Sequence, residues 1–236
     1  TVARTNCIQT VRAPVYIILN LVSVSIILLA PHLTLFSLSR VTATVIEVGF
    51  STILLTAFFL AVFSSIHLIY YEIQSKTIVN LLSKPIQKYK VVLGKYLGTC
   101  IALTLSSLVL FIALVLCAQM SADKYKDLLF NNLLVVKMTK VFVLLLLQVY
   151  IISSFTTLFS SFLPLSLTAL FSFILFTLGH LMDFIQSSAQ GAGFIAVGLS
   201  NFLSFIVPNL EFFSLINEVT SHTKLPVSYA IMNVCY

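Results

Sequence analysis

The chain has 236 residues, of which 59% are hydrophobic and only 8% are charged. A soluble domain carries roughly 25% charged residues, so this composition excludes a soluble fold and makes lipid the solvent for much of the surface. The net charge of +6 is interpreted as topology signals and headgroup contacts, not as an affinity for nucleic acid.

Long intervals without charge predict the membrane spans, since about 20 apolar residues cross the hydrocarbon layer. Three such intervals contain 27, 24 and 27 residues; they lie between Arg12 and Arg40, Glu47 and Glu72, and Lys95 and Asp123. The spans that they predict are 13–36, 48–70 and 97–120.

A fourth interval, between Lys140 and Asp183, holds 42 uncharged residues. That is roughly 63 Å of helix, enough for two crossings. Pro164, with serines around it, is the expected break, because proline cannot donate a backbone hydrogen bond. The interval therefore predicts a hairpin of two spans, 141–160 and 165–184.

The C-terminal part is less regular. Residues 186–193 are polar and are expected to be flexible. The apolar run 194–207 has fourteen residues, which is short for a span and typical of a re-entrant or interfacial helix on the outer side. Residues 226–236 look like the start of a partial sixth span. The prediction is a single all-α integral membrane domain over 1–236, with five to six transmembrane helices.

The loop 70–96 holds five of the thirteen basic residues and one acid. A cation-rich loop between two spans is expected on the cytoplasmic side, which also places the N-terminus there and residues 121–138 outside.

Within this loop, residues 72–84 form an amphipathic pattern, with Glu72 and Lys76 as a favourable i,i+4 pair. Pro85 predicts a break at Lys84, and a second helix is expected to run from Ile86 into the third span. Gly94 and Gly98, four residues apart, would let another helix approach closely. A helix of this kind can be gripped by a cytosolic protein; the alternative is a loop that faces headgroups and only sets topology.

The amino-acid sequence of the loop resembles that of one family. Glu72-x4-Thr77-x3-Leu81-Leu82-Ser83-Lys84-Pro85, followed by Leu93-Gly94-Lys95-Tyr96-Leu97-Gly98, resembles the first cytoplasmic loop of ABC-2 type transporter permeases. Weaker matches follow in the same order at Leu158–Ser161, Gly179–Leu181 and Pro208–Phe213. The resemblance covers roughly residues 15–220.

The resemblance implies a permease half, similar to type V exporters, that dimerises with a second copy or a paralogue and binds a separate ABC ATP-binding subunit. The loop helix would be the coupling helix, and export the direction. The coupling residues carried over are Glu72, Thr77, Leu81, Leu82, Ser83, Lys84, Pro85, Gly94 and Lys95. ATP and Mg²⁺ would bind in the partner, so no cofactor, catalytic residue or metal ligand is expected in this chain. The location implied is the plasma membrane, in bacteria the inner membrane.

Other side chains are given structural roles. Cys7, Cys100, Cys117 and Cys235 have no metal spacing and are interpreted as ordinary apolar residues. A haem between His67 and His180 is disfavoured because the two lie at opposite faces, so polar helix packing is the preferred interpretation. Asp183, Glu211, Glu218 and Glu47 are expected in solvated positions near span ends.

No glycine-rich P-loop precedes Gly94 and Lys95, so ATP binding in this chain is not predicted. Two other classes of function remain open. One is a membrane-anchor or assembly subunit of a larger complex without transport activity. The other is a membrane-embedded enzyme, which the lack of acid/base pairs in the spans disfavours.

Overall fold

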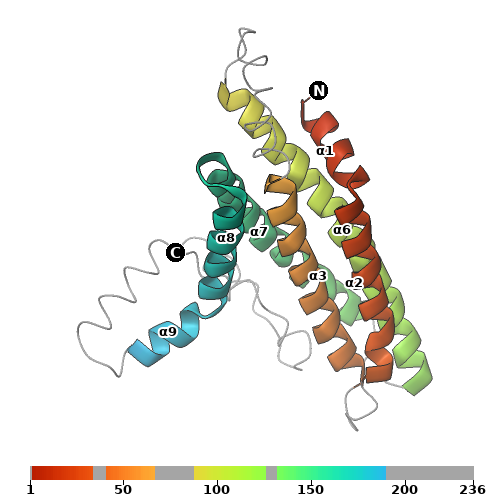
Figure 1. The fold of residues 1–236 in the computed structure, drawn as a ribbon. Helices are drawn as coiled ribbons and strands as arrows, with labels where there is room; N and C mark the ends of the chain where they lie inside the picture. The colour runs from red at the N-terminus through yellow and green to blue at the C-terminus, as the bar shows by residue number, and fades with distance from the viewer. Residues whose placement is uncertain (1, 34–40, 67–87, 126–131, 190–236) are drawn as a thin grey trace.

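The computed structural model describes residues 2–33, 41–66, 88–125 and 132–189 (Figure 1). All regular structure in these ranges is helical. The helices are α1 (Val2–Arg12), α2 (Pro14–Leu33), α3 (Val41–Ser65), α6 (Lys88–Tyr125), α7 (Asn132–Phe162), α8 (Leu165–His180) and α9 (Met182–Ala189).

Four of the described helices are long and apolar enough to cross a membrane. The apolar segments are Pro14–His32 in α2, Thr42–Ser65 in α3, Leu93–Ser121 in α6 and Leu134–Phe162 in α7. The spans α2, α3, α6 and α7 alternate in direction (Figure 1). The prediction of an all-α membrane protein is confirmed. Residues 194–207 and 226–236, predicted to be a re-entrant segment and a partial span, lie outside the described residues.

The core lies between α2, α3, α6 and α7. Its largest fully buried side chains include Phe50, Ile46 and Leu114. Phe111 of α6 stacks on Phe142 of α7 with ring centroids 4.4 Å apart. Within a membrane such packing contributes van der Waals contact rather than hydrophobic burial, because the surrounding lipid is equally apolar.

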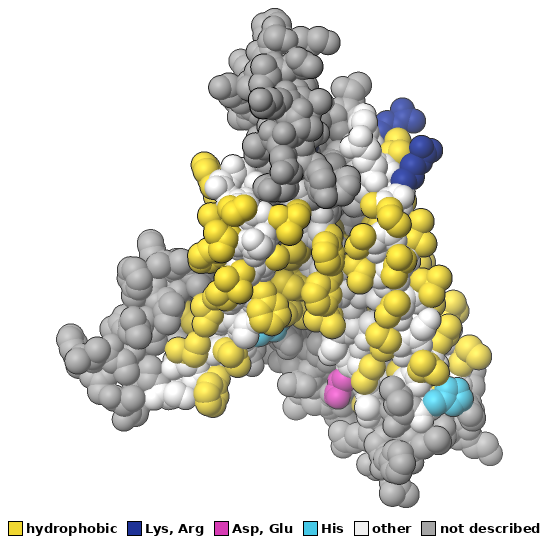
Figure 2. All heavy atoms as spheres, viewed as in Figure 1, with side chains coloured by type: hydrophobic (Ala, Val, Ile, Leu, Met, Phe, Trp, Pro, Cys, Tyr) yellow, Lys and Arg dark blue, Asp and Glu magenta, His cyan; other side chains and the backbone are white. Residues whose placement is uncertain are grey.

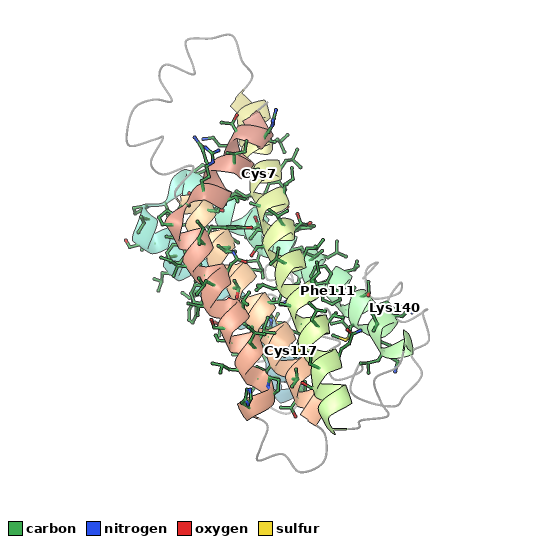
Figure 3. The ribbon with its side chains drawn as sticks, turned by 90° about the vertical axis from the view of Figure 1, so that its right-hand side faces the viewer. Cys7, Phe111, Cys117 and Lys140 are labelled. Atoms are coloured by element: carbon green, nitrogen blue, oxygen red, sulfur yellow. The ribbon has the colours of Figure 1, made fainter. Side chains whose placement is uncertain are left out.

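Cys117 of α6 is a buried member of this core. Figure 3 shows Cys117 far along α6 from the end of the bundle that holds Cys7, and Lys140 on α7. The thiol of Cys117 donates a hydrogen bond to the backbone O of Ile27 at 3.3 Å. Cys7, Cys100 and Cys117 are free thiols. The burial of Cys117 among apolar side chains confirms its interpretation as a core residue.

Apolar side chains also cover the outside of the bundle (Figure 2). On α2 they include Ile18 and Leu21, which are 60% and 64% exposed. On α6, Leu97, Ile101 and Leu116 are also exposed apolar side chains. Monomeric soluble proteins rarely expose contiguous apolar patches of more than a few hundred Å². This surface is therefore the one that lipid covers.

The predicted fifth span, 165–184, is not one continuous helix. Helix α8 ends at His180, and Leu181 has φ −94° and ψ 3°, with its N–H bonded to the carbonyls of Leu178 and Thr177. Gly179 weakens the helix by about 1 kcal/mol relative to alanine. Helix α9 begins at Met182 and continues through Ala189, so residues 186–189 are helical. The rest of the stretch expected to be flexible, 190–193, lies outside the described residues.

Two further details differ from the sequence expectation. Helix α3 begins at Val41, seven residues before the predicted span, so half-buried Glu47 lies inside a membrane-length helix and not ahead of it. At the N-terminus, where no helix was predicted ahead of the first span, Val2–Arg12 forms α1. This helix meets α2 at Ala13 and packs along the first part of α6 (Figure 1).

Candidate coupling end of the bundle

Most of the predicted coupling residues lie outside the described ranges. These are Glu72, Thr77, Leu81, Leu82, Ser83, Lys84 and Pro85. Gly94 and Lys95 are described, and both belong to helix α6, as expected of the helix predicted to run from Ile86 into the third span. Lys95 is only 9% exposed, so its carbon stem is packed within the bundle. Whether these residues couple to a partner stays a prediction.

The described helices fix both attachment points of the loop. Helix α3 ends at Ser65 and helix α6 begins at Lys88, and the N-terminus of the chain lies at the same end of the bundle (Figure 1). That end also holds the turn between α7 and α8, which contains Pro164. We call this part of the molecule the coupling end.

Helix α1 is fastened to α6 by one small residue and one amide. The Nδ2 of buried Asn6 donates a hydrogen bond to the backbone O of Lys95 at 2.7 Å. Gly98 faces the same turn of α1: a Cβ added there would lie 2.7 Å from the backbone O of Ala3 and 2.7 Å from the Cβ of Asn6. The predicted close approach at the glycine pair is therefore confirmed for Gly98, and the approaching helix is α1.

Hydroxyl groups join α1, α3 and α7 at the coupling end. Thr10 donates its one hydroxyl hydrogen to the backbone O of Asn6 at 3.0 Å, so Ser64, 3.3 Å away, is the donor to Thr10 Oγ1. On the other side of α3, Ser160 of α7 donates to the backbone O of Ser65 at 3.0 Å. The last turn of α3 is thus held from both sides.

A second layer of polar contacts lies deeper in the bundle and ties α2 to its neighbours. Tyr16 donates its hydroxyl to the backbone O of Ala102 at 3.3 Å. Ser106 of α6 donates to Oδ1 of Asn20 at 2.5 Å. Hydrogen bonds of this kind between membrane helices contribute on average about 0.6 kcal/mol each, and together these two link α2 to α6.

A pocket of about 210 Å³ opens at the coupling end. Side chains of α1, α2, α3 and the first residue of α8 line it, and most of its lining is apolar. Leu60 and Ile66 form buried parts of the wall, whereas Val15, Phe63 and Leu165 are 40–47% exposed. The pocket is therefore open to the surroundings of the bundle on its exposed side.

His180 has protein partners on both ring nitrogens. Its Nδ1 is 2.9 Å from the backbone O of Phe176, so this nitrogen carries a hydrogen. Its Nε2 is 3.0 Å from Nε2 of Gln148, which is buried in α7. This arrangement confirms the polar-packing interpretation of His180. His67, the other half of the disfavoured haem pair, lies outside the described residues.

Sequence reasoning missed helix α1 altogether. Its buried face is made of Ala3, Asn6 and Thr10, which are small or polar, whereas Ile8 is 41% exposed. A search for apolar periodicity cannot find such a helix. The usable signal was the i,i+4 spacing of Asn6 and Thr10, together with a glycine pair that needed a partner. In the described ranges, no group of three or more His, Cys, Asp or Glu side chains is placed to hold a metal ion.

Comparison with known proteins adds one finding. A family model described as "ABC-2 family transporter protein" matches residues 11–233. The match includes α2 to α9, the loop between α3 and α6, and the residues that follow α9. No curated protein matches the chain.

Proposed function

The chain belongs to the ABC-2 transporter family, and on that premise we propose that it is a permease subunit driven by a separate ATP-binding subunit. The family match over residues 11–233 is the observation that carries this proposal. The permease role and the multi-pass membrane location follow from the family and from the apolar helices. The partner, the coupling residues and the direction are the proposed parts.

The contacts at the coupling end can transmit a force from the loop to several helices. The loop between α3 and α6 is attached to two helices that are cross-connected through α1 by Asn6, Thr10, Ser64 and Gly98. A force applied to the loop therefore acts on α1, α3 and α6 together and not on one helix. Such cross-connection suits a machine in which closure of an ATP-binding subunit must reorient several spans.

The assembly that we propose contains two permease chains, the second a copy or a paralogue, with an ATP-binding subunit docked on the helix expected at 72–84. Mg²⁺ and ATP belong to that subunit. The substrate path would follow the junction of the two permeases, with export as the direction and the plasma membrane, in bacteria the inner membrane, as the location. The resemblance of the 72–98 segment to the family's first cytoplasmic loop supports these assignments.

Two substitutions test the docking helix. Leu81→Pro costs about 3 kcal/mol of helix and is expected to abolish co-purification with the ATP-binding subunit while the spans still insert. Glu72→Lys reverses the one acid of the loop and is expected to weaken the permease's effect on ATP hydrolysis. Asp127→Lys, an equal charge change in the segment that connects α6 to α7, is the matched control and should leave both properties unchanged.

The readouts are membrane insertion, co-purification and ATPase activity in the complex. If Leu81→Pro inserts normally and still binds and stimulates the ATP-binding subunit, the coupling-helix assignment is wrong. If the chain instead purifies with other membrane subunits and with no ATPase, it is an anchor or assembly subunit.

A further inference from the structure

The pocket at the coupling end offers a ligand little polar recognition inside. Its two buried hydroxyls, Thr10 and Ser64, already bond to each other and to the backbone O of Asn6. The remaining buried wall is aliphatic, with Leu60 3% and Ile66 5% exposed. A polar solute would lose its hydration here without compensation, so the interior favours a hydrocarbon chain.

The depth of the pocket matches the boundary between headgroups and hydrocarbon. It is lined by Tyr16, two residues after α2 begins, by Ser64 near the end of α3, and by Leu165, the first residue of α8. All three positions lie at the edge of an apolar helix.

One exposed cation lies between two pocket-lining residues in the sequence. Gln9 and Ala13 of the α1–α2 junction line it, and exposed Arg12 lies between them in sequence, about 60° around the helix from Gln9. Arg4, also exposed, lies about 140° from Gln9 on the other side of α1. Figure 2 shows basic side chains over α1, above the apolar surface of the spans. Arg12 is therefore placed to meet an anionic headgroup whose chain occupies the pocket.

We propose that this pocket binds an anionic phospholipid from the surrounding membrane, with part of an acyl chain against Leu60, Phe63 and Ile66 and the phosphate near Arg12 and Gln9. The bound lipid would fill the space between the α1–α2 junction and the starting turn of α8. The inference goes beyond the proposed transport function and does not rest on it, because it uses only the pocket, its depth and Arg12.

The absence of tryptophan from the chain gives a direct assay. Phe63→Trp places a single fluorophore on the rim of the pocket, where Phe63 is 47% exposed. Phe171→Trp is the matched control: Phe171 is 44% exposed on α8 and does not line the pocket. The full chain is reconstituted in vesicles that contain a minor fraction of brominated phosphatidylglycerol or of brominated phosphatidylcholine, and quenching by the two lipids is compared.

For Phe63→Trp we expect an about fivefold preference for the brominated anionic lipid, the factor that one cation near a membrane surface provides. Phe171→Trp should show no preference. Adding Arg12→Gln should remove the preference of Phe63→Trp, whereas adding Arg4→Gln should keep it. Equal quenching by both lipids at Phe63→Trp, or a preference that survives Arg12→Gln, would overturn the proposal.

A second measurement leaves every residue that lines the pocket unchanged. The unmodified chain and its Arg12→Gln and Arg4→Gln variants are released from a mixed-lipid membrane, and the retained lipids are identified by native mass spectrometry. The site predicts that phosphatidylglycerol stays with the unmodified chain and with Arg4→Gln but not with Arg12→Gln. Retention of phosphatidylcholine to the same extent would contradict it. ATPase stimulation is recorded in parallel, so a failure of lipid binding and a failure of coupling are distinguished.

Discussion

Gly98 shows how one missing side chain sets the position of a helix. One of the two atoms nearest to a Cβ added there is a backbone oxygen, that of Ala3, which cannot rotate away as a side chain can. The glycine therefore decides whether α1 can lie on α6. The sequence allowed the close approach to be predicted, but not its partner, because the partner helix carries no apolar stripe.

Substitution of Gly98 should separate α1 from the bundle. Gly98→Val is expected to cost about 1–3 kcal/mol, the usual range for overpacking. The measurement is the rate at which half-buried Cys7 reacts with a maleimide, with the other three cysteines replaced. The rate should rise when α1 detaches.

Gly94→Val is the matched control for this substitution, since it changes a glycine one turn earlier on the same helix. Its effect on Cys7 should be smaller. An unchanged rate in Gly98→Val would mean that α1 does not depend on this contact.

The Gln148–His180 pair predicts a measurable coupling between α7 and α8. A double-mutant cycle with Gln148→Leu and His180→Phe should give an interaction free energy of about 0.6–1.7 kcal/mol, the range found for hydrogen bonds between membrane helices. The sign should be stabilising, because the amide and the ring otherwise lose their partners in a buried place. Unfolding in mixed micelles measures it, and additive single effects would contradict the pairing.

At the level of elements, sequence predicted the membrane helices well and their interruptions poorly. Charge-free intervals identify α2, α3, α6 and α7, because lipid excludes charge over a fixed length. The break at Pro164 was likewise predictable from its missing N–H. The end of α8 at His180 was not, because it accompanies a hydrogen bond to Gln148, thirty-two residues earlier in the chain.

The residues of the candidate site were predictable from the sequence, but the contacts around them were not. The charge of the loop and its resemblance to a family single out residues 72–95. The contacts that fasten its flanking helices, Asn6 to the backbone of Lys95 and Thr10 to Ser64, join residues 89 and 54 positions apart. No local pattern contains that pairing.

The placement of α1 against α3 can be tested by cross-linking. With the four native cysteines replaced by alanine, Thr10→Cys and Ser64→Cys should form a disulfide on mild oxidation, because the two hydroxyl oxygens are 3.3 Å apart. Mass spectrometry of the digested chain detects the bridge. Ile8→Cys with Ser64→Cys is the control that should not cross-link, since Ile8 faces outward. Equal bridging in both pairs would contradict the docking of α1.

At the scale of the whole molecule, the alternation of the spans predicts which segments share a side of the membrane. The N-terminus, the end of α3 and the start of α6 lie at one end of the bundle, and the end of α6 lies at the other (Figure 1). The excess of lysine in the loop assigns its end to the cytoplasm.

Single cysteines in a cysteine-free background test this topology. Arg4→Cys and Ser75→Cys should react with a membrane-impermeant maleimide only after the cells are opened, whereas Lys124→Cys should react in intact cells. Ser121 is unsuitable as the outer probe because it is 2% exposed. Reaction of Ser75→Cys and Lys124→Cys from the same side would overturn the topology.

Helix α6 runs without interruption from Lys88 to Tyr125, 38 residues or about 57 Å, which is nearly twice the thickness of the hydrocarbon layer. In a helix of that length, a small tilt moves the far end by a large distance. If the helix pivots near one end, a tilt of about 5° displaces the other end by about 5 Å. Gly98 and Asn6 hold α1 against α6 near the first end of α6. A small change in tilt at that end would therefore appear as a displacement of several ångströms at the opposite face of the membrane.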